Sequence, residues 1–202
     1  MMPSPSDDPS REAKQALRRR MQECLRHVPP LPAELPSFRR LLADPLFQNA
    51  SALVGYIPIQ AELPVLPLLN QALRQGKRLL LPRFQEGGYT LALVRNLEED
   101  LQPGKYRIPE PAPSCPEVLE LPDPALWLIP GLAFDRRGTR LGRGGGFYDR
   151  LRSRFPGGFP LGLCHQCQLL ETEEIPSEPW DRPVRLILTP EQWVIPHALL
   201  PS

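Results

Sequence analysis

The 202-residue sequence lacks a long hydrophobic run. Its longest uncharged apolar stretch, 124–134, is about half as long as a membrane-spanning helix must be. The first ten residues, MMPSPSDDPS, have neither the cationic start nor the apolar core of a secretory signal. These absences predict a cytoplasmic protein that does not associate with membranes, and residues 1–9 are expected to form a flexible tail.

The sequence also lacks a large excess of positive or negative charge, and cysteine is scarce. The 24 basic residues balance 23 acidic residues, for a net charge of +1. No global field therefore attracts nucleic acid, and any anion site must be local. The four cysteines do not indicate a disulfide framework in a chain of this length. Cys164 and Cys167 have the CxxC spacing, but no second pair completes a structural zinc site, so we interpret them as small residues at a strand end.

The chain has no internal repeats, and its length suits one domain over residues 1–202. The apolar periodicity predicts helices over 10–28, 33–48, 64–75 and 147–155, and strands over 52–59, 78–82, 89–95, 127–129, 159–165 and 184–189. The strand, helix and strand between 52 and 82 form a βαβ unit, which implies a parallel sheet. We therefore expect an α/β fold of three layers, a mainly parallel sheet flanked by helices, with ligands beyond the carboxyl ends of the strands.

Glycine is concentrated in one segment, at positions 138, 142, 144, 145 and 146. Such residues permit positive φ angles and close approach of the backbone to a ligand. The helix predicted over 147–155 follows, and its N-terminus favours an anion. Arg140, Arg143 and Arg150 add guanidinium groups suited to phosphate oxygens. We interpret the segment as a polyphosphate cradle. It matches neither the Walker nor the dinucleotide-binding pattern, and a mobile, arginine-rich surface loop is the alternative.

The string over 130–150, PGLAFDRRGTRLGRGGGFYDR, resembles the signature of the 5-formyltetrahydrofolate cyclo-ligases. The resemblance extends over about residues 11–190 and implies a Rossmann-like fold of the NagB/RpiA/CoA transferase-like kind. It also implies an enzyme that uses ATP and Mg²⁺ to convert 5-formyltetrahydrofolate to 5,10-methenyltetrahydrofolate, with release of ADP and phosphate, by phosphorylating the formyl oxygen. The expected protein is a monomer that acts on these small molecules and does not bind nucleic acid.

The resemblance implies ATP-binding residues in two places. Lys14 and Arg18 match a K-x-x-x-R pattern in the family's first helix, whereas their spacing alone is typical of a solvated basic face. The other ATP-binding residues belong to the cradle: Arg140, Leu141, Gly142, Arg143, Gly144, Gly145, Gly146, Phe147 and Tyr148.

Catalysis and metal binding are expected at the start of the helix after the cradle and near the last strand. The resemblance implies that Arg140, Tyr148 and Asp149 are catalytic and that Asp149 and Asp181 hold Mg²⁺, which carboxylates bind together with phosphate oxygens. Without the resemblance, a carboxylate in the first turn of a helix is by default a partner of the helix dipole. Asp135 is interpreted as a turn residue.

The folate is expected against residues from two other segments. The resemblance places Ile57, Glu62 and Tyr106 there, although a lone loop carboxylate such as Glu62 is usually solvent-facing. The chain departs from the family pattern at two positions: Arg107 stands where the family has a small residue in a YGIxEP segment, and Phe147 stands where the family often has tyrosine.

Two other functions stay open at this point. One is a non-catalytic folate- or nucleotide-binding paralogue, or a different folate- or thiamine-linked kinase, to which Arg107 lends weight. The other is an arginine-rich RNA-binding module, which predicts salt-dependent affinity for RNA and no ATP turnover. No Ser-His-Asp or Cys-His set can be assembled from the sequence, which is consistent with phosphoryl transfer, where catalysis rests on positioning and charge.

Overall fold

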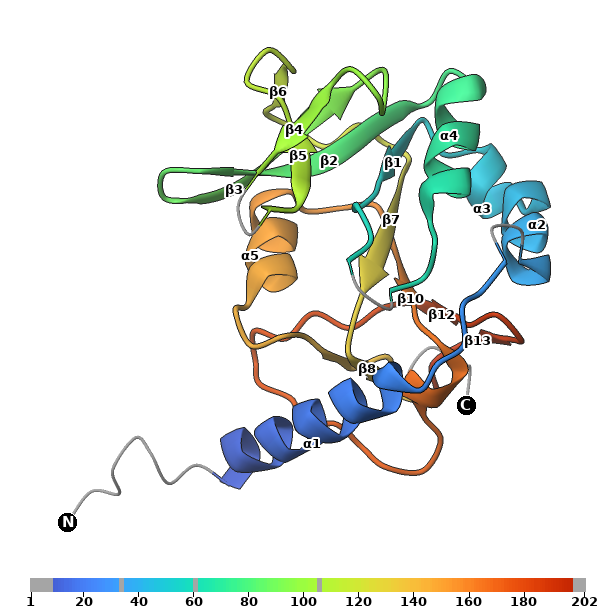
Figure 1. Cartoon of the computed structure of the whole chain (residues 1–202), viewed down its shortest axis with the longest axis vertical. Helices are drawn as coiled ribbons and strands as arrows, with labels where there is room; N and C mark the ends of the chain where they lie inside the picture. Colours follow the sequence, from blue (N-terminus) through green and yellow to red (C-terminus); the bar gives the residue numbers. More distant parts are fainter. Residues whose placement is uncertain (1–8, 33–34, 60–61, 105–106, 198–202) are drawn as a thin grey trace.

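The computed structural model describes residues 9–32, 35–59, 62–104 and 107–197 (Figure 1). Within these ranges an eight-stranded sheet has the spatial order β13 (Trp193–Val194), β12 (Leu186–Leu188), β10 (Phe159–Leu163), β7 (Ala125–Pro130), β1 (Ala52–Val54), β2 (Arg78–Gln85), β3 (Gly88–Val94) and β6 (Glu117–Val118). The central strands from β12 to β2 are parallel, and the strands outside them are antiparallel. The prediction of an α/β fold with a mainly parallel sheet is confirmed.

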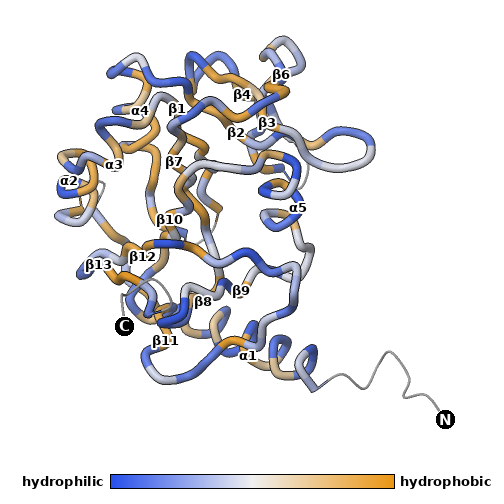
Figure 2. Tube along the Cα trace, turned by 180° about the vertical axis from the view of Figure 1, so that it is seen from behind, coloured by the Kyte–Doolittle hydropathy of each residue, from blue (hydrophilic) through white to orange (hydrophobic). Residues whose placement is uncertain are grey.

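Helices cover both faces of this sheet (Figure 1). Helices α2 (Pro36–Ala43), α3 (Pro45–Gln48) and α4 (Leu66–Arg74) pack on one face, and α5 (Phe147–Arg154) packs on the other. Figure 2 shows that hydrophobic residues are concentrated in the central strands. The three layers follow from the sequence, because a parallel sheet needs apolar cover on both faces.

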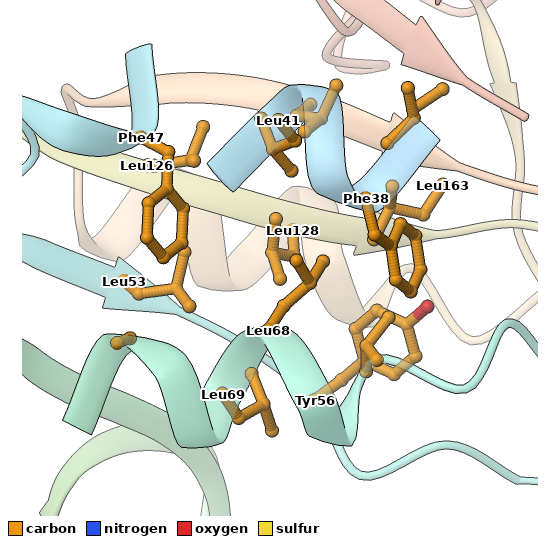
Figure 3. Packing of buried hydrophobic residues seen from close by; sticks show 14 of the residues in the cluster. Phe38, Leu41, Phe47, Leu53, Tyr56, Leu68, Leu69, Leu126, Leu128 and Leu163 are labelled. Atoms are coloured by element: carbon orange, nitrogen blue, oxygen red, sulfur yellow. The ribbon is translucent and has the colours of Figure 1, made fainter. Parts of the chain in front are cut away.

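The central strands supply side chains to two hydrophobic cores in alternation. Leu126 and Leu128 of β7 enter the core beneath α2, α3 and α4 (Figure 3), whereas Trp127 and Ile129 enter the core beneath α5. Successive strand residues point to opposite faces, so an uninterrupted apolar strand can serve both cores. Each of these side chains is fully buried, and burial of one contributes about 1.5–3 kcal/mol.

The prediction of a single helix over 33–48 is wrong. The chain forms two helices, α2 and α3, that are separated at Asp44. A residue before proline is disfavoured in helical geometry, and Asp44 is extended, with φ −77° and ψ 140°. The Asp44 carboxylate caps the second helix, α3, by accepting a hydrogen bond from the Leu46 amide at 2.9 Å.

The strand predicted over 52–59 is also too long, since β1 ends at Val54 and the chain then leaves the sheet.

Several short elements were not predicted. Strands β8 (Ala133–Asp135), β9 (Arg140–Leu141) and β11 (Leu169–Leu170) form a three-stranded sheet, and η2 (Gln166–Gln168) precedes β11. Strands β4 (Leu101–Pro103) and β5 (Pro109–Pro111) form a hairpin. Helix α1 (Pro9–Arg26) packs on the three-stranded sheet through Leu17 and Met21. The small sheet therefore holds α1 against the segment that carries the glycine loop.

No helix in the described ranges combines the length and the apolar composition that crossing a bilayer requires.

Arg107 lies in the turn between β4 and β5 and has a left-handed backbone conformation, with φ 61°. The turn is closed by hydrogen bonds from the Arg107 amide to the Gly104 carbonyl at 3.2 Å and from the Gly104 amide to the Ile108 carbonyl at 2.9 Å. Residues with a Cβ atom rarely adopt this conformation. Arg107 thus keeps a backbone geometry that suits glycine, at the position where it departs from the family pattern.

We predict that Arg107→Gly raises the free energy of unfolding by about 1 kcal/mol, because glycine removes the left-handed strain. Part of the gain is lost to the greater freedom of glycine in the unfolded chain. Urea denaturation measures the change. Arg107→Ala is the control, because alanine keeps a Cβ atom and should give no such gain. Equal stabilities of the two variants would contradict the explanation.

Candidate active site

The order of the parallel strands places a cleft at their carboxyl ends. From β1 the chain continues to β2 on one side, whereas β7 lies on the other side of β1 and continues to β10. Such a reversal of direction opens a crevice between the two strands, where ligands of α/β sheets bind. A cavity of about 640 Å³ lies here, lined by the segments that follow β1 and β7, by the C-terminal half of β2, by α1 and by the glycine loop.

The glycine loop, residues 142–146, connects β9 to α5 and forms one wall of the cleft. Gly144 has φ 102°, and Gly146, with φ 59°, is the N-cap residue of α5. Left-handed geometry at both positions explains the glycines. Arg18 crosses from α1 and donates from Nε to the Gly142 carbonyl at 3.0 Å. Partial burial lowers the pKa of Arg18, although the nearby Asp181 opposes the shift.

Gly138 does not belong to this wall. It lies in the turn between β8 and β9, and a Cβ atom there would stand 2.4 Å from the Val184 carbonyl oxygen. The expectation that all five glycines form one cradle is therefore wrong for Gly138, whose role is in the packing of the turn.

Two carboxylates of the cleft are paired with cations. Asp149, in the first turn of α5, accepts from Arg140 Nη2 at 2.8 Å, and both side chains are largely buried. Asp181 accepts from Lys14 Nζ at 3.0 Å and from the Glu178 amide at 2.8 Å. Four charged groups from distant parts of the sequence thus meet in one cleft, as pairs of opposite charge.

The end of the cleft beside Arg143 is less polar. Glu62 lies here, and its carboxylate accepts from the Ile59 amide at 3.1 Å and lies 3.5 Å from Arg143 Nη2. Burial raises the pKa of Glu62, although the Ile59 amide and Arg143 oppose the shift. Burial likewise raises the pKa of the Tyr148 phenol, so it stays protonated at neutral pH. The carboxylate and the phenol therefore sit in a poorly solvated pocket.

Four aromatic rings extend this end of the cleft in a continuous series, from the β2–β3 hairpin to α5. The ring centroids of Phe84 and Tyr89 are 5.1 Å apart, those of Tyr89 and Phe147 are 4.1 Å apart, and those of Phe147 and Tyr148 are 4.7 Å apart. All three contacts are edge-to-face, a favourable arrangement of aromatic quadrupoles. The aromatic wall offers an apolar surface to a flat ligand.

Comparison with known proteins assigns the chain to a family. The model of the 5-formyltetrahydrofolate cyclo-ligase family matches residues 10–190. The chain belongs to this family. The chain is 34% identical over 157 residues to the 5-formyltetrahydrofolate cyclo-ligase of Escherichia coli K12, covering 76% of this chain and 85% of that protein. The Haemophilus influenzae protein of the same name is 32% identical over 145 residues, covering 70% of this chain and 76% of that protein.

Solved structures agree with the family assignment. An NMR structure of Aquifex aeolicus 5,10-methenyltetrahydrofolate synthetase superposes with a TM-score of 0.72 at 27% identity, covering 93% of each chain. A structure of the Mycoplasma pneumoniae synthetase, at 18% identity and a TM-score of 0.62, supports the fold. The predictions of the family and of an enzyme of that family are confirmed.

The structure brings together the residues that the sequence suggested. All of those within the described ranges line the cleft: Lys14, Arg18, Ile57, Glu62, Arg140, Leu141, Gly142, Arg143, Gly144, Gly145, Gly146, Phe147, Tyr148, Asp149 and Asp181. Tyr106 lies outside the described residues. Four further aromatic residues of the described ranges line the cleft and were not predicted from the sequence: Tyr56, Phe84, Tyr89 and Trp180. Phe84 could have been found, because it stands near the carboxyl end of a parallel strand.

Two other groups have structural roles. Asp135 is fully buried and accepts from the Arg137, Thr139 and Ile175 amides, which fixes the turn after β8. Burial raises the pKa of Cys164 and raises that of Cys167 to about 12, with a further contribution from Cys24. These thiols are therefore protonated at neutral pH, whereas a thiol must be ionised to bind metal or attack a substrate.

Asp149 and Asp181 fit a metal ion that is bound together with a phosphate group. Among the described residues, no group of three or more His, Cys, Asp or Glu side chains could form a cage for an ion. Mg²⁺ does not need such a cage, because one or two carboxylates, phosphate oxygens and water usually complete its shell. Asp149 and Asp181 supply that number of hard oxygen ligands next to the glycine loop.

We predict that Glu62→Gln stabilises the free protein, and more so as the pH rises. The raised pKa of Glu62 means that the fold disfavours the ionised carboxylate. Below its ordinary pKa of 4.5, Glu62 is protonated in both the folded and unfolded states and carries no penalty, whereas above that pH the folded state must ionise it.

Urea unfolding at pH 4 and pH 7 measures this effect. The stability gained by Glu62→Gln over the wild type should be larger at pH 7. Glu120→Gln is the control, because Glu120 is exposed. A gain that is the same at both pH values would refute the burial of an ionisable carboxylate.

Proposed function

We propose that this chain converts 5-formyltetrahydrofolate to 5,10-methenyltetrahydrofolate, with ATP as co-substrate and Mg²⁺ bound to its phosphates. The main support is that a cationic glycine loop and a poorly solvated aromatic pocket adjoin each other in one cleft. ATP and a reduced folate would then meet with their reacting groups adjacent. We also propose that residues 1–202 form a single cyclo-ligase domain and act as a monomer.

At the cationic end, Lys14, Arg18 and Arg140 would bind the triphosphate, and residues 141–148 would surround it. In the free protein, Arg140 and Lys14 are neutralised by Asp149 and Asp181. The phosphates would compete for these cations, which would leave the carboxylates available to Mg²⁺. The metal, when bound, neutralises charge on the phosphates.

At the aromatic end, Ile57 and Glu62 would contact the pterin ring, and Tyr106 is assigned to the same ligand. The Glu62 carboxylate can accept hydrogen bonds from pterin N–H groups, and Phe84 and Tyr89 can contact the flat pyrimidinone ring of the pterin. A buried carboxylate gains more from such donors than an exposed one, because the surroundings have a low dielectric.

The chemistry needs no protein nucleophile. The formyl oxygen attacks the γ-phosphorus of ATP, and ADP leaves. Phosphorylation turns that oxygen into a good leaving group, so the second folate nitrogen attacks the formyl carbon, loses its proton, and phosphate departs. Arg140 would stabilise the charge that develops on the transferred phosphoryl group, and Tyr148, protonated and buried, would donate a hydrogen bond between the two substrates.

The test is formation of the methenyl product, followed by its absorbance, with 5-formyltetrahydrofolate, ATP and Mg²⁺ present. We expect product only when all three are supplied. Asp149→Ala and Arg140→Ala should each lower kcat by about 100-fold or more. Binding of the folate without turnover would favour a non-catalytic paralogue, and salt-dependent RNA binding without turnover would favour the RNA-binding module.

A second prediction compares neighbours on α1. Arg18 lines the cleft, whereas Arg19 is exposed and does not. Arg18→Ala should raise the KM for ATP by about 10- to 100-fold, since a charged hydrogen bond contributes about 1.5–3 kcal/mol. Arg19→Ala should leave it unchanged, although both variants lose one positive charge. Equal increases in the KM for ATP in the two variants would mean that α1 attracts ATP only through its overall positive charge.

A further inference from the structure

Tyr56 carries a buried hydroxyl group that the functions above do not use. It follows β1, is 4% exposed and lines the cleft. Its hydroxyl oxygen has no hydrogen-bond partner among the described residues. Figure 3 shows the Tyr56 ring at one edge of the leucine-rich core, with its oxygen pointing away from Leu69.

A buried hydroxyl without a hydrogen-bond partner lowers the stability of the folded protein when no ligand is bound. Burial removes it from water, and no protein group replaces the lost hydrogen bonds. Phenylalanine would occupy the same space in the core without that loss. A buried polar group without a partner therefore needs a reason, and a missing ligand is one.

The surroundings indicate what the hydroxyl can bind. Burial raises the pKa of Tyr56, and the negative charge of Glu62 raises it further. The hydroxyl is thus protonated and can donate, and Tyr56 and Glu62 line the same cleft. A donor next to a carboxylate acceptor complements a ligand edge on which a carbonyl group stands beside an N–H group, as in the amide edge of a pterin.

We propose that the Tyr56 hydroxyl donates a hydrogen bond to the carbonyl oxygen of the reduced pterin, while Glu62 accepts from the neighbouring N–H group. This assignment rests on the proposed function and adds a residue that determines specificity for the folate. The unpartnered hydroxyl then gains a hydrogen-bond partner only when the substrate is present.

Tyr56→Phe separates this role from a structural one. Because the hydroxyl has no partner in the free protein, the variant should be at least as stable as the wild type in urea. Its KM for 5-formyltetrahydrofolate should rise about 3- to 10-fold, the loss expected for one neutral hydrogen bond, with kcat and the KM for ATP nearly unchanged. Thermal stabilisation by added folate should fall accordingly.

Ser37→Ala is the matched control. Ser37 also has a buried hydroxyl without a partner in the described structure, but it does not line the cleft. Its removal should change no KM.

Three outcomes would overturn the assignment: a wild-type KM for folate in Tyr56→Phe, equal loss of affinity for ATP and folate, or a less stable free variant. Absence of turnover in the wild type would instead refute the proposed function. Titration of both proteins with 5-formyltetrahydrofolate then still decides whether the hydroxyl contacts it.

Discussion

The site depends on the parallel pairing of β1 with β7. Ala52 pairs with Ala125 and Val54 pairs with Trp127, so the two strands begin at the same level, and β7 continues for three residues beyond the end of β1. The chain leaves them in opposite directions along the sheet, and the two outgoing segments both line the cleft. One segment leads to Tyr56 and Glu62, and the other leads to the glycine loop. Glu62 and Arg143, which are 81 positions apart in the sequence, are thus adjacent because two hydrophobic strands are held in register.

The buried charges and hydroxyl of the cleft are a stability cost that the cores offset. Glu62 has a raised pKa, Tyr56 lacks a hydrogen-bond partner, and Arg140 is only 7% exposed in its pair with Asp149. Such groups are expensive to bury, since water would solvate them better. They are gathered where the sheet meets the cleft, whereas the strands behind them carry fully buried leucines on both faces. Stability and binding are therefore supplied by different parts of the same strands.

The sequence predicted the long elements and the residues of the glycine loop, for identifiable reasons. Apolar periodicity and the βαβ spacing are local signals, and the string over 130–150 is specific enough to name a family. Strands of two or three residues have too little periodicity to be seen, so β8, β9 and β11 were missed. Gly138 was grouped with its neighbours because its packing against Val184 depends on tertiary contacts. Tyr56 was missed for the same reason, because an unpartnered hydroxyl has no sequence signal.

The proposed reaction requires one cleft to hold a nucleotide and a reduced pterin end to end. A crystal structure with a non-hydrolysable ATP analogue, Mg²⁺ and 5-formyltetrahydrofolate tests it most directly. We expect the terminal phosphate against the glycine loop, the pterin against Glu62, and the formyl oxygen facing that phosphate. A pterin bound outside the cleft, or a triphosphate remote from residues 142–146, would contradict it.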